Sequence, residues 1–89
     1  MDPLLALVVK NGRPVTRLGL TISSKVGNAV VRARLRRLLR ELFRHRRLQW
    51  PPGLDVVLVA RASAKDATFE TLARAFESIS RRLQRLAGP

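Results

Sequence analysis

The sequence KVGNAVVRARLRRLLRELFRHRR, residues 25–47, decides how the rest of the chain is organised. After Gly27 it contains no glycine or proline, and Asn28 is a residue type that often caps the first turn of a helix. Apolar residues recur on one side of a helical wheel: Val31, Leu35, Leu38, Leu39 and Leu42. Arginines recur on an adjacent side: Arg32, Arg36, Arg37, Arg40, Arg44 and Arg47. This spacing predicts an amphipathic helix with an apolar side and an arginine side.

Two apolar segments precede this helix and predict strands. Residues 4–9 are apolar, and residues 16–23 alternate apolar and polar side chains, which is the pattern of a half-buried strand. Between them, Asn11 and Gly12 indicate a turn. We therefore expect the two segments to form a β-hairpin with a loop of several residues.

The segments after the helix predict a third strand and a second helix. Residues 51–53 (PPG) end the first helix, and the valine-rich residues 54–60 predict a strand buried on both faces. Asp66 or Thr68 can cap a C-terminal helix whose apolar residues recur at intervals of three and four: Phe69, Leu72, Phe76, Ile79, Leu83 and Leu86. The order β-β-α-β-α predicts an α+β fold, a two-layer sandwich. We expect one domain over residues 1–89, with a small sheet of three to four strands and two main helices on one face.

The charge of the chain points to a polyanionic partner. There are 18 Lys and Arg residues against 6 Asp and Glu, a formal net charge of +12. Nine of the basic residues, and only one acidic residue, Glu41, lie within residues 25–47. A solvated helix face usually mixes both signs of charge, and this one does not. Because a guanidinium can donate two parallel hydrogen bonds to phosphate, the pattern predicts a nucleic-acid-binding surface.

Candidates for catalysis are weak. His45 is the only histidine, and it lies among arginines with no partner carboxylate evident in the sequence, which makes it a weak candidate for a general base. The six acidic residues are scattered without metal-ligand spacing, and the chain has no cysteine for disulfides or thiolate metal sites. We therefore expect no catalytic residue and no metal site in this chain by itself. Whether it is part of an enzyme stays open on these grounds.

Features of membrane or exported proteins are also missing from the sequence. No apolar run approaches the roughly 18 residues of a membrane span. Residues 1–3 (MDP) do not resemble the basic start of a signal peptide. We expect a cytoplasmic protein with no membrane partner.

Residues 17–44, RLGLTISSKVGNAVVRARLRRLLRELFR, resemble the signature of the bacterial ribonuclease P protein family. Nearly every fixed position of that signature is met. The downstream segment PGLDVVLVAR, residues 52–61, also looks like the last strand of the family, and the resemblance covers about residues 4–86.

The resemblance implies a function. The family's holoenzyme removes the 5′ leader from precursor tRNA, and catalysis belongs to its RNA subunit with magnesium ions. The protein is an accessory subunit whose basic helix docks on the catalytic RNA and whose sheet holds the single-stranded leader. The implied partners are therefore ribonuclease P RNA and precursor tRNA, and magnesium enters only through the RNA subunit.

The resemblance also assigns roles to residues. Those expected to contact RNA are Arg17, Lys25, Asn28, Arg32, Arg34, Arg36, Arg37, Arg40, Arg44 and Arg61. Gly27 would permit a tight turn into the helix, and Ala29 and Val30 would pack inward in its first turn. The strand–helix–strand crossover is expected to be left-handed, against the usual rule.

The sequence departs from the family pattern in two respects. Ala33 stands where the family has an asparagine. Family members usually begin with a basic helix, whereas the first predicted strand here starts at Leu4, and Leu7 occupies a position where the family tends to have an aromatic residue. An uncovered apolar sheet surface would make self-association possible. A general RNA-binding or ribosome-associated module that has lost leader binding therefore remains an alternative.

A cationic amphipathic protein of the membrane surface is a third hypothesis. It is less consistent with the pattern, because the sheet needs the apolar side of the helix for its core.

Overall fold

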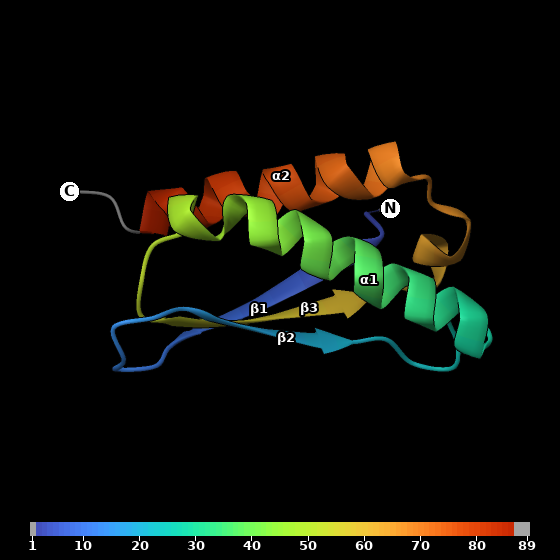
Figure 1. The fold of residues 1–89 in the computed structure, drawn as a ribbon, viewed down its shortest axis with the longest axis horizontal. Coiled ribbons are helices and arrows are strands. Elements are labelled where there is room, and N and C mark those ends of the chain that lie inside the picture. The colour runs from blue at the N-terminus through green and yellow to red at the C-terminus, as the bar shows by residue number, and fades with distance from the viewer. Residues whose placement is uncertain (1, 87–89) are drawn as a thin grey trace.

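The chain folds into a sheet layer and a helix layer. The computed structural model describes residues 2–86. Its elements are β1 Leu4–Lys10, β2 Arg17–Thr21, α1 Ala29–Arg46, the 3-10 helix η1 Arg47–Gln49, β3 Leu54–Ala60, the 3-10 helix η2 Ala62–Asp66, and α2 Phe69–Leu86. Figure 1 shows both long helices on the same side of the three-stranded sheet. The predicted two-layer α+β fold is thereby confirmed.

The strand order of the sheet is β1-β3-β2. β1 is antiparallel to β3 and β2 is parallel to it, so the predicted hairpin between β1 and β2 is wrong. β3 is the most apolar strand, and it buries the largest area of apolar side chain when it lies in the centre of the sheet. The loop after β1 is also tied to the start of β3, because Asn11 donates its backbone N–H to Gly53 O at 2.9 Å and its side-chain amide to Asp55 at 2.9 Å.

The connection from β2 through α1 to β3 is left-handed. In Figure 1, β2 runs from left to right nearest the viewer, α1 returns above the sheet, and β3 lies behind β2 in the same direction. A path that turns counter-clockwise while moving away from the viewer has left-handed sense. Nearly all such crossovers are right-handed, so the feature implied by the resemblance is a distinctive one.

The two faces of the sheet differ in burial. Along β3, the side chains of Leu54, Val56, Leu58 and Ala60 are buried beneath the helices, whereas the alternate residues are only half-buried. The prediction that this strand is buried on both faces is therefore wrong. Because both helices cover the same face, the other face has no covering layer within residues 2–86.

The core lies between the sheet and the helices. α1 contributes Leu35 and Leu39, which have no solvent-exposed surface. α2 begins after Thr68, whose hydroxyl accepts a hydrogen bond from the Thr71 N–H at 3.1 Å, and it contributes four buried apolar residues: Leu72, Phe76, Ile79 and Leu83. Phe69 and Leu86, the two ends of the predicted apolar stripe, remain exposed because they are the first and last residues of the helix.

The start of α1 differs from the expectation in which side chains face the core. Asn28 caps the helix as predicted, since its side-chain oxygen accepts a hydrogen bond from the Val31 N–H at 3.0 Å. Ala29 and Val30 are exposed, Val30 to 77%, so the prediction that they pack inward is wrong. Val26, only 1% exposed, takes the core position ahead of the cap.

Gly27 is needed for close packing rather than for an unusual backbone angle. Its φ is not in the left-handed region, which only Gly12 and Gly53 occupy among the described residues, at +68° and +80°. A Cβ atom at Gly27 would lie 2.9 Å from both Cβ and Cγ1 of Val31. The close approach of the two chain segments therefore requires glycine at this position.

Candidate nucleic-acid interface

Four of the arginines expected to bind RNA share one surface on α1. Together with Ala33 and Glu41 they line a shallow hollow of about 430 Å³: Arg36, Arg37, Arg40 and Arg44. Within residues 2–86, the first three of these arginines form no ion pair. Like charges at i and i+4 destabilise a helix slightly. The arrangement therefore fits an external anion better than a role in stability.

The acidic residues neutralise only the C-terminal end of this arginine series. Glu41 accepts a hydrogen bond from Arg44 at 2.6 Å and lies 3.1 Å from His45 Nε2. The hydrogen bond from Arg44 holds the pKa of the Glu41 carboxyl below its usual value. From α2, Glu77 reaches Arg46 at 3.3 Å. The positive charge that remains available is thus concentrated between Arg32 and Arg40.

The four expected contacts near the start of α1 differ in availability. Lys25 is exposed, whereas the Asn28 side chain is occupied by the helix cap. Arg34 donates a hydrogen bond to Ala67 O at 3.3 Å, which joins α1 to the segment before α2. Arg32 is half-buried, and its Nε is shielded from solvent without a hydrogen-bond partner among residues 2–86. Lys25 and Arg32 are therefore the better candidates for contact with an anion.

Arg17 and Arg61 lie away from α1, at opposite ends of β3. Arg17 makes a two-pronged ion pair with Asp55, with Nε–Oδ1 and Nη2–Oδ2 distances of 2.8 and 2.6 Å. Hydrogen bonds from Arg17 and then from Asn11 lower the pKa of Asp55 to about 2. Arg61 follows β3 and anchors the chain through its backbone N–H, which donates to Pro3 O at 2.8 Å.

The uncovered face of the sheet is mainly apolar. The strand register places residues from β1, β3 and β2 side by side on this face: Leu5, Leu7, Val9, Val57, Val59, Gly19 and Thr21. Leu7 and Val9 are 55% and 63% exposed. The Arg17–Asp55 ion pair closes one end of this face. A flat apolar surface between two arginines is suited to an unpaired nucleic-acid strand.

Residues 2–86 contain no group of three or more His, Cys, Asp or Glu side chains that could hold a metal ion. None of the helices in this part of the chain combines the length and the apolar character needed to cross a bilayer.

Two features of the surface were not predicted from the sequence. The interhelix ion pair of Arg46 with Glu77 depends on how α1 and α2 pack, and no local pattern indicates it. An uncovered apolar sheet surface was expected from the resemblance, but which residues of β1 form it was not, because both faces of residues 4–9 are apolar and burial cannot be assigned from alternation. The helix-wheel position of the arginines, in contrast, was sufficient to find the α1 surface.

Comparison with known proteins identifies the family. A family model described as Ribonuclease P matches residues 2–84. The chain belongs to the ribonuclease P protein family. The ribonuclease P protein component of Clostridioides difficile is 38% identical over 80 residues, which cover 89% of this chain and 70% of that protein. The corresponding protein of Lachnoclostridium phytofermentans is 40% identical over 78 residues, covering 88% and 67%.

Solved ribonuclease P proteins have the same fold. The protein from Thermotoga maritima matches with a TM-score of 0.80 and 30% identity, covering 92% of this chain and 76% of that one. The protein from Staphylococcus aureus matches with a TM-score of 0.81 and 27% identity, covering 99% and 77%. Membership of the ribonuclease P protein family implies partnership with ribonuclease P RNA.

Proposed function

We propose that this chain is the RNA-binding accessory subunit of ribonuclease P and assists removal of the 5′ leader from precursor tRNA. The observation that carries the proposal is the coincidence of the family match with the unpaired arginines of α1. In this proposal α1 and the turn before it dock on the catalytic RNA through Lys25, Arg32, Arg36, Arg37 and Arg40. Such contacts go to phosphates, so they position the protein without reading sequence.

The uncovered sheet face is the proposed site for the single-stranded leader. Its support is the apolar surface of β1 and β3, with Arg17 at one end and Arg61 beyond the other. Leu7 contributes apolar area at the position where the family tends to have an aromatic ring, so we expect contact with bases to be weaker than stacking on an aromatic platform. The same exposed row also predicts some self-association, which sedimentation would detect.

Magnesium belongs to the RNA subunit in this proposal. The described part of the chain offers no cluster of acidic or histidine side chains for it. When bound to the RNA, magnesium would stabilise negative charge at the cleaved phosphate. The protein's own contribution is to bind and orient the two RNAs.

Cleavage of precursor tRNA by a bacterial ribonuclease P RNA at low magnesium, with and without this protein, tests the proposal. We expect the protein to increase the cleavage rate. Tight binding to ribonuclease P RNA without faster cleavage would show that the protein docks on this RNA but does not assist removal of the leader. Equal affinity for unrelated structured RNAs, again without stimulation, would support the general RNA-binding module instead, an alternative that Ala33 in the α1 hollow keeps open.

A further inference from the structure

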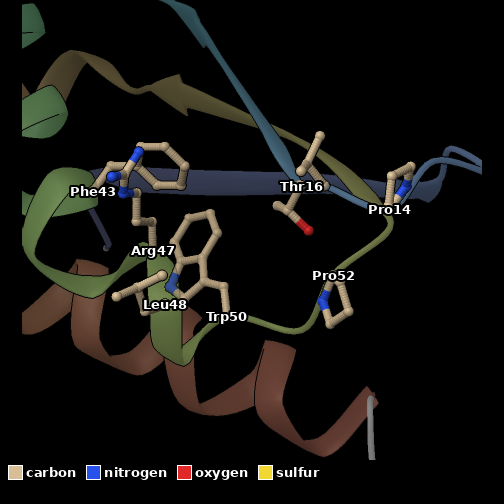
Figure 2. A pocket seen from close by; sticks show the side chains of 8 residues that line it. Pro14, Thr16, Phe43, Arg47, Leu48, Trp50 and Pro52 are labelled. Carbon is tan, nitrogen blue, oxygen red and sulfur yellow. The ribbon is translucent and has the colours of Figure 1, made fainter.

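A pocket at the C-terminal end of α1 is not used by the RNA contacts described above. It has a volume of about 390 Å³, within the ~300–1,000 Å³ typical of small-ligand sites. Figure 2 shows it between the end of α1, η1, the loop before β2 and the segment before β3. Its lining includes Val15, Phe43, Arg47, Leu48 and Trp50.

The inner part of this pocket is aromatic and rigid. Trp50 is 4% exposed, meets Phe43 edge-on at a ring-centre distance of 5.0 Å and stacks on Phe76 at 5.3 Å. Its indole N–H donates to Ser80 Oγ at 2.8 Å, which fixes the orientation of the ring. Because Phe76 and Phe43 already pack on Trp50, only a small part of the indole reaches the pocket, and the half-buried Phe43 provides more of the accessible aromatic wall. This wall is preformed and needs little reordering when a flat ligand binds.

The rim of the pocket is apolar and open to solvent. Val15 is 60% exposed and Leu48 is 92% exposed, so neither side chain contributes to the core. Both side chains line the pocket and add exposed apolar surface to its mouth. The rim would be covered if a ligand filled the pocket.

One cation is available at this pocket. Arg47 forms no ion pair among residues 2–86, whereas Arg44 and Arg46 just before it are paired with Glu41 and Glu77. Arg47 directly follows α1 on the same helical side as Arg36 and Arg40. At 1.5 Å per residue it lies roughly 10 Å along the axis from Arg40. A polyanion bound along α1 would therefore reach the pocket.

We propose that this pocket receives one unstacked nucleobase of the ribonuclease P RNA that docks along α1. Phe43 and Trp50 provide its apolar walls, and Arg47 donates hydrogen bonds to the base edge or to the neighbouring phosphate. Every nucleobase has an apolar face, so the site is expected to tolerate different bases. The inference rests on the proposed docking of RNA to α1, but it makes a separate claim about base contact.

The fluorescence of Trp50 reports on this pocket directly, because the chain has one tryptophan and no tyrosine. The probes are a ten-nucleotide oligoadenylate and an abasic ribose-phosphate oligomer of the same length, with binding followed separately by anisotropy. We expect both oligomers to bind, but only the oligoadenylate to quench Trp50 and to bind about tenfold more tightly. If the two oligomers bind with equal affinity and neither quenches Trp50, the proposed base contact in the pocket is overturned, whereas docking of RNA on α1 is not. Failure of both oligomers to bind would overturn docking and pocket together.

Three variants that each lower the net charge by one unit separate the pocket from general electrostatics. Leu48→Glu and Arg47→Gln alter the rim, and Lys65→Gln is the control in η2, at the opposite end of the molecule (Figure 1). We expect the first two to abolish the advantage of the base-bearing oligomer, and Lys65→Gln to retain it. An equal effect of all three variants would overturn the proposal.

The identity of the bound group is tested with whole RNAs and a model compound. Ribonuclease P RNA alone should quench Trp50. Quenching that occurs only when precursor tRNA is present would contradict the proposal that the bound base belongs to ribonuclease P RNA. N-acetyl-leucinamide serves as a model of a protein side chain. If it quenches Trp50 and RNA does not displace it, the pocket binds a protein side chain and the nucleobase proposal is overturned.

Discussion

At the scale of single residues, the hydrogen bond between Trp50 and Ser80 joins the segment between η1 and β3 to α2. Both side chains are buried, and Ser80 also donates to Phe76 O at 3.0 Å. Replacing Ser80 by alanine leaves the indole N–H buried without a partner. We predict that Ser80→Ala lowers the free energy of unfolding by about 1–3 kcal/mol. Urea denaturation measures this change, and Ser78→Ala, an exposed serine on the same helix, should have little effect.

The ion pair of Asp55 with Arg17 makes stability depend on pH in the acid range. The pKa of Asp55 in the fold is about 2, below its ordinary value of 3.8, so the native state favours the charged carboxylate. Its contribution is complete above pH 4 and is lost as the pH falls toward 2. We predict that acid denaturation between these values is steeper for the wild type than for Asp55→Asn. Parallel curves for the two proteins would contradict the assignment.

At the scale of elements, the junction of β2 and α1 depends on the contact of Gly27 with Val31. A methyl group at Gly27 would lie 2.9 Å from a Cβ atom that is fixed to the helix backbone. We predict that Gly27→Ala costs about 1–3 kcal/mol of stability because the helix must shift. Adding Val31→Ala should recover part of this loss in a double-mutant cycle. Alanine at position 31 removes Cγ1, also 2.9 Å away, but keeps Cβ, so additive effects of the two changes would show that the contact with Cγ1 is unimportant.

The elements themselves were largely predictable from the sequence, whereas their pairing was not. Helical spacing and turn residues are local, and they placed α1, α2 and β3 close to their observed bounds. The strand order depends on which strand gains most from a central position and on hydrogen bonds between Asn11 and β3, which are distant in sequence. The left-handed crossover came from family resemblance, because general rules favour the opposite hand.

The candidate site was predictable to the same degree. The arginine side of α1 follows from helical periodicity alone. Which arginines remain unpaired depends on long-range packing, since Glu77 and Ala67 reach α1 from segments about thirty residues away. Asn28 was assigned to RNA contact, but its side chain is occupied in capping the helix. The pocket beside Arg47 combines four separate segments, and no sequence pattern indicated it.

At the scale of the whole molecule, a net charge of +12 gives the chain a general attraction for RNA. We propose more than this, namely that the unpaired arginines of α1 form the docking surface. A general attraction would weaken equally when any basic residue is removed. A docking surface loses specific phosphate contacts, and each contact contributes roughly 0.7–0.9 to the slope of log affinity against log salt concentration.

The most direct test compares two triple variants with equal loss of charge, measuring their affinity for a bacterial ribonuclease P RNA over a series of salt concentrations. One replaces Arg36, Arg37 and Arg40 of α1 by glutamine, and the control replaces Lys65, Arg82 and Arg85 in η2 and α2. We predict that the α1 variant loses affinity and about two to three units of slope, while the control stays close to the wild type. Equal slopes for the two variants would contradict docking through the arginines of α1.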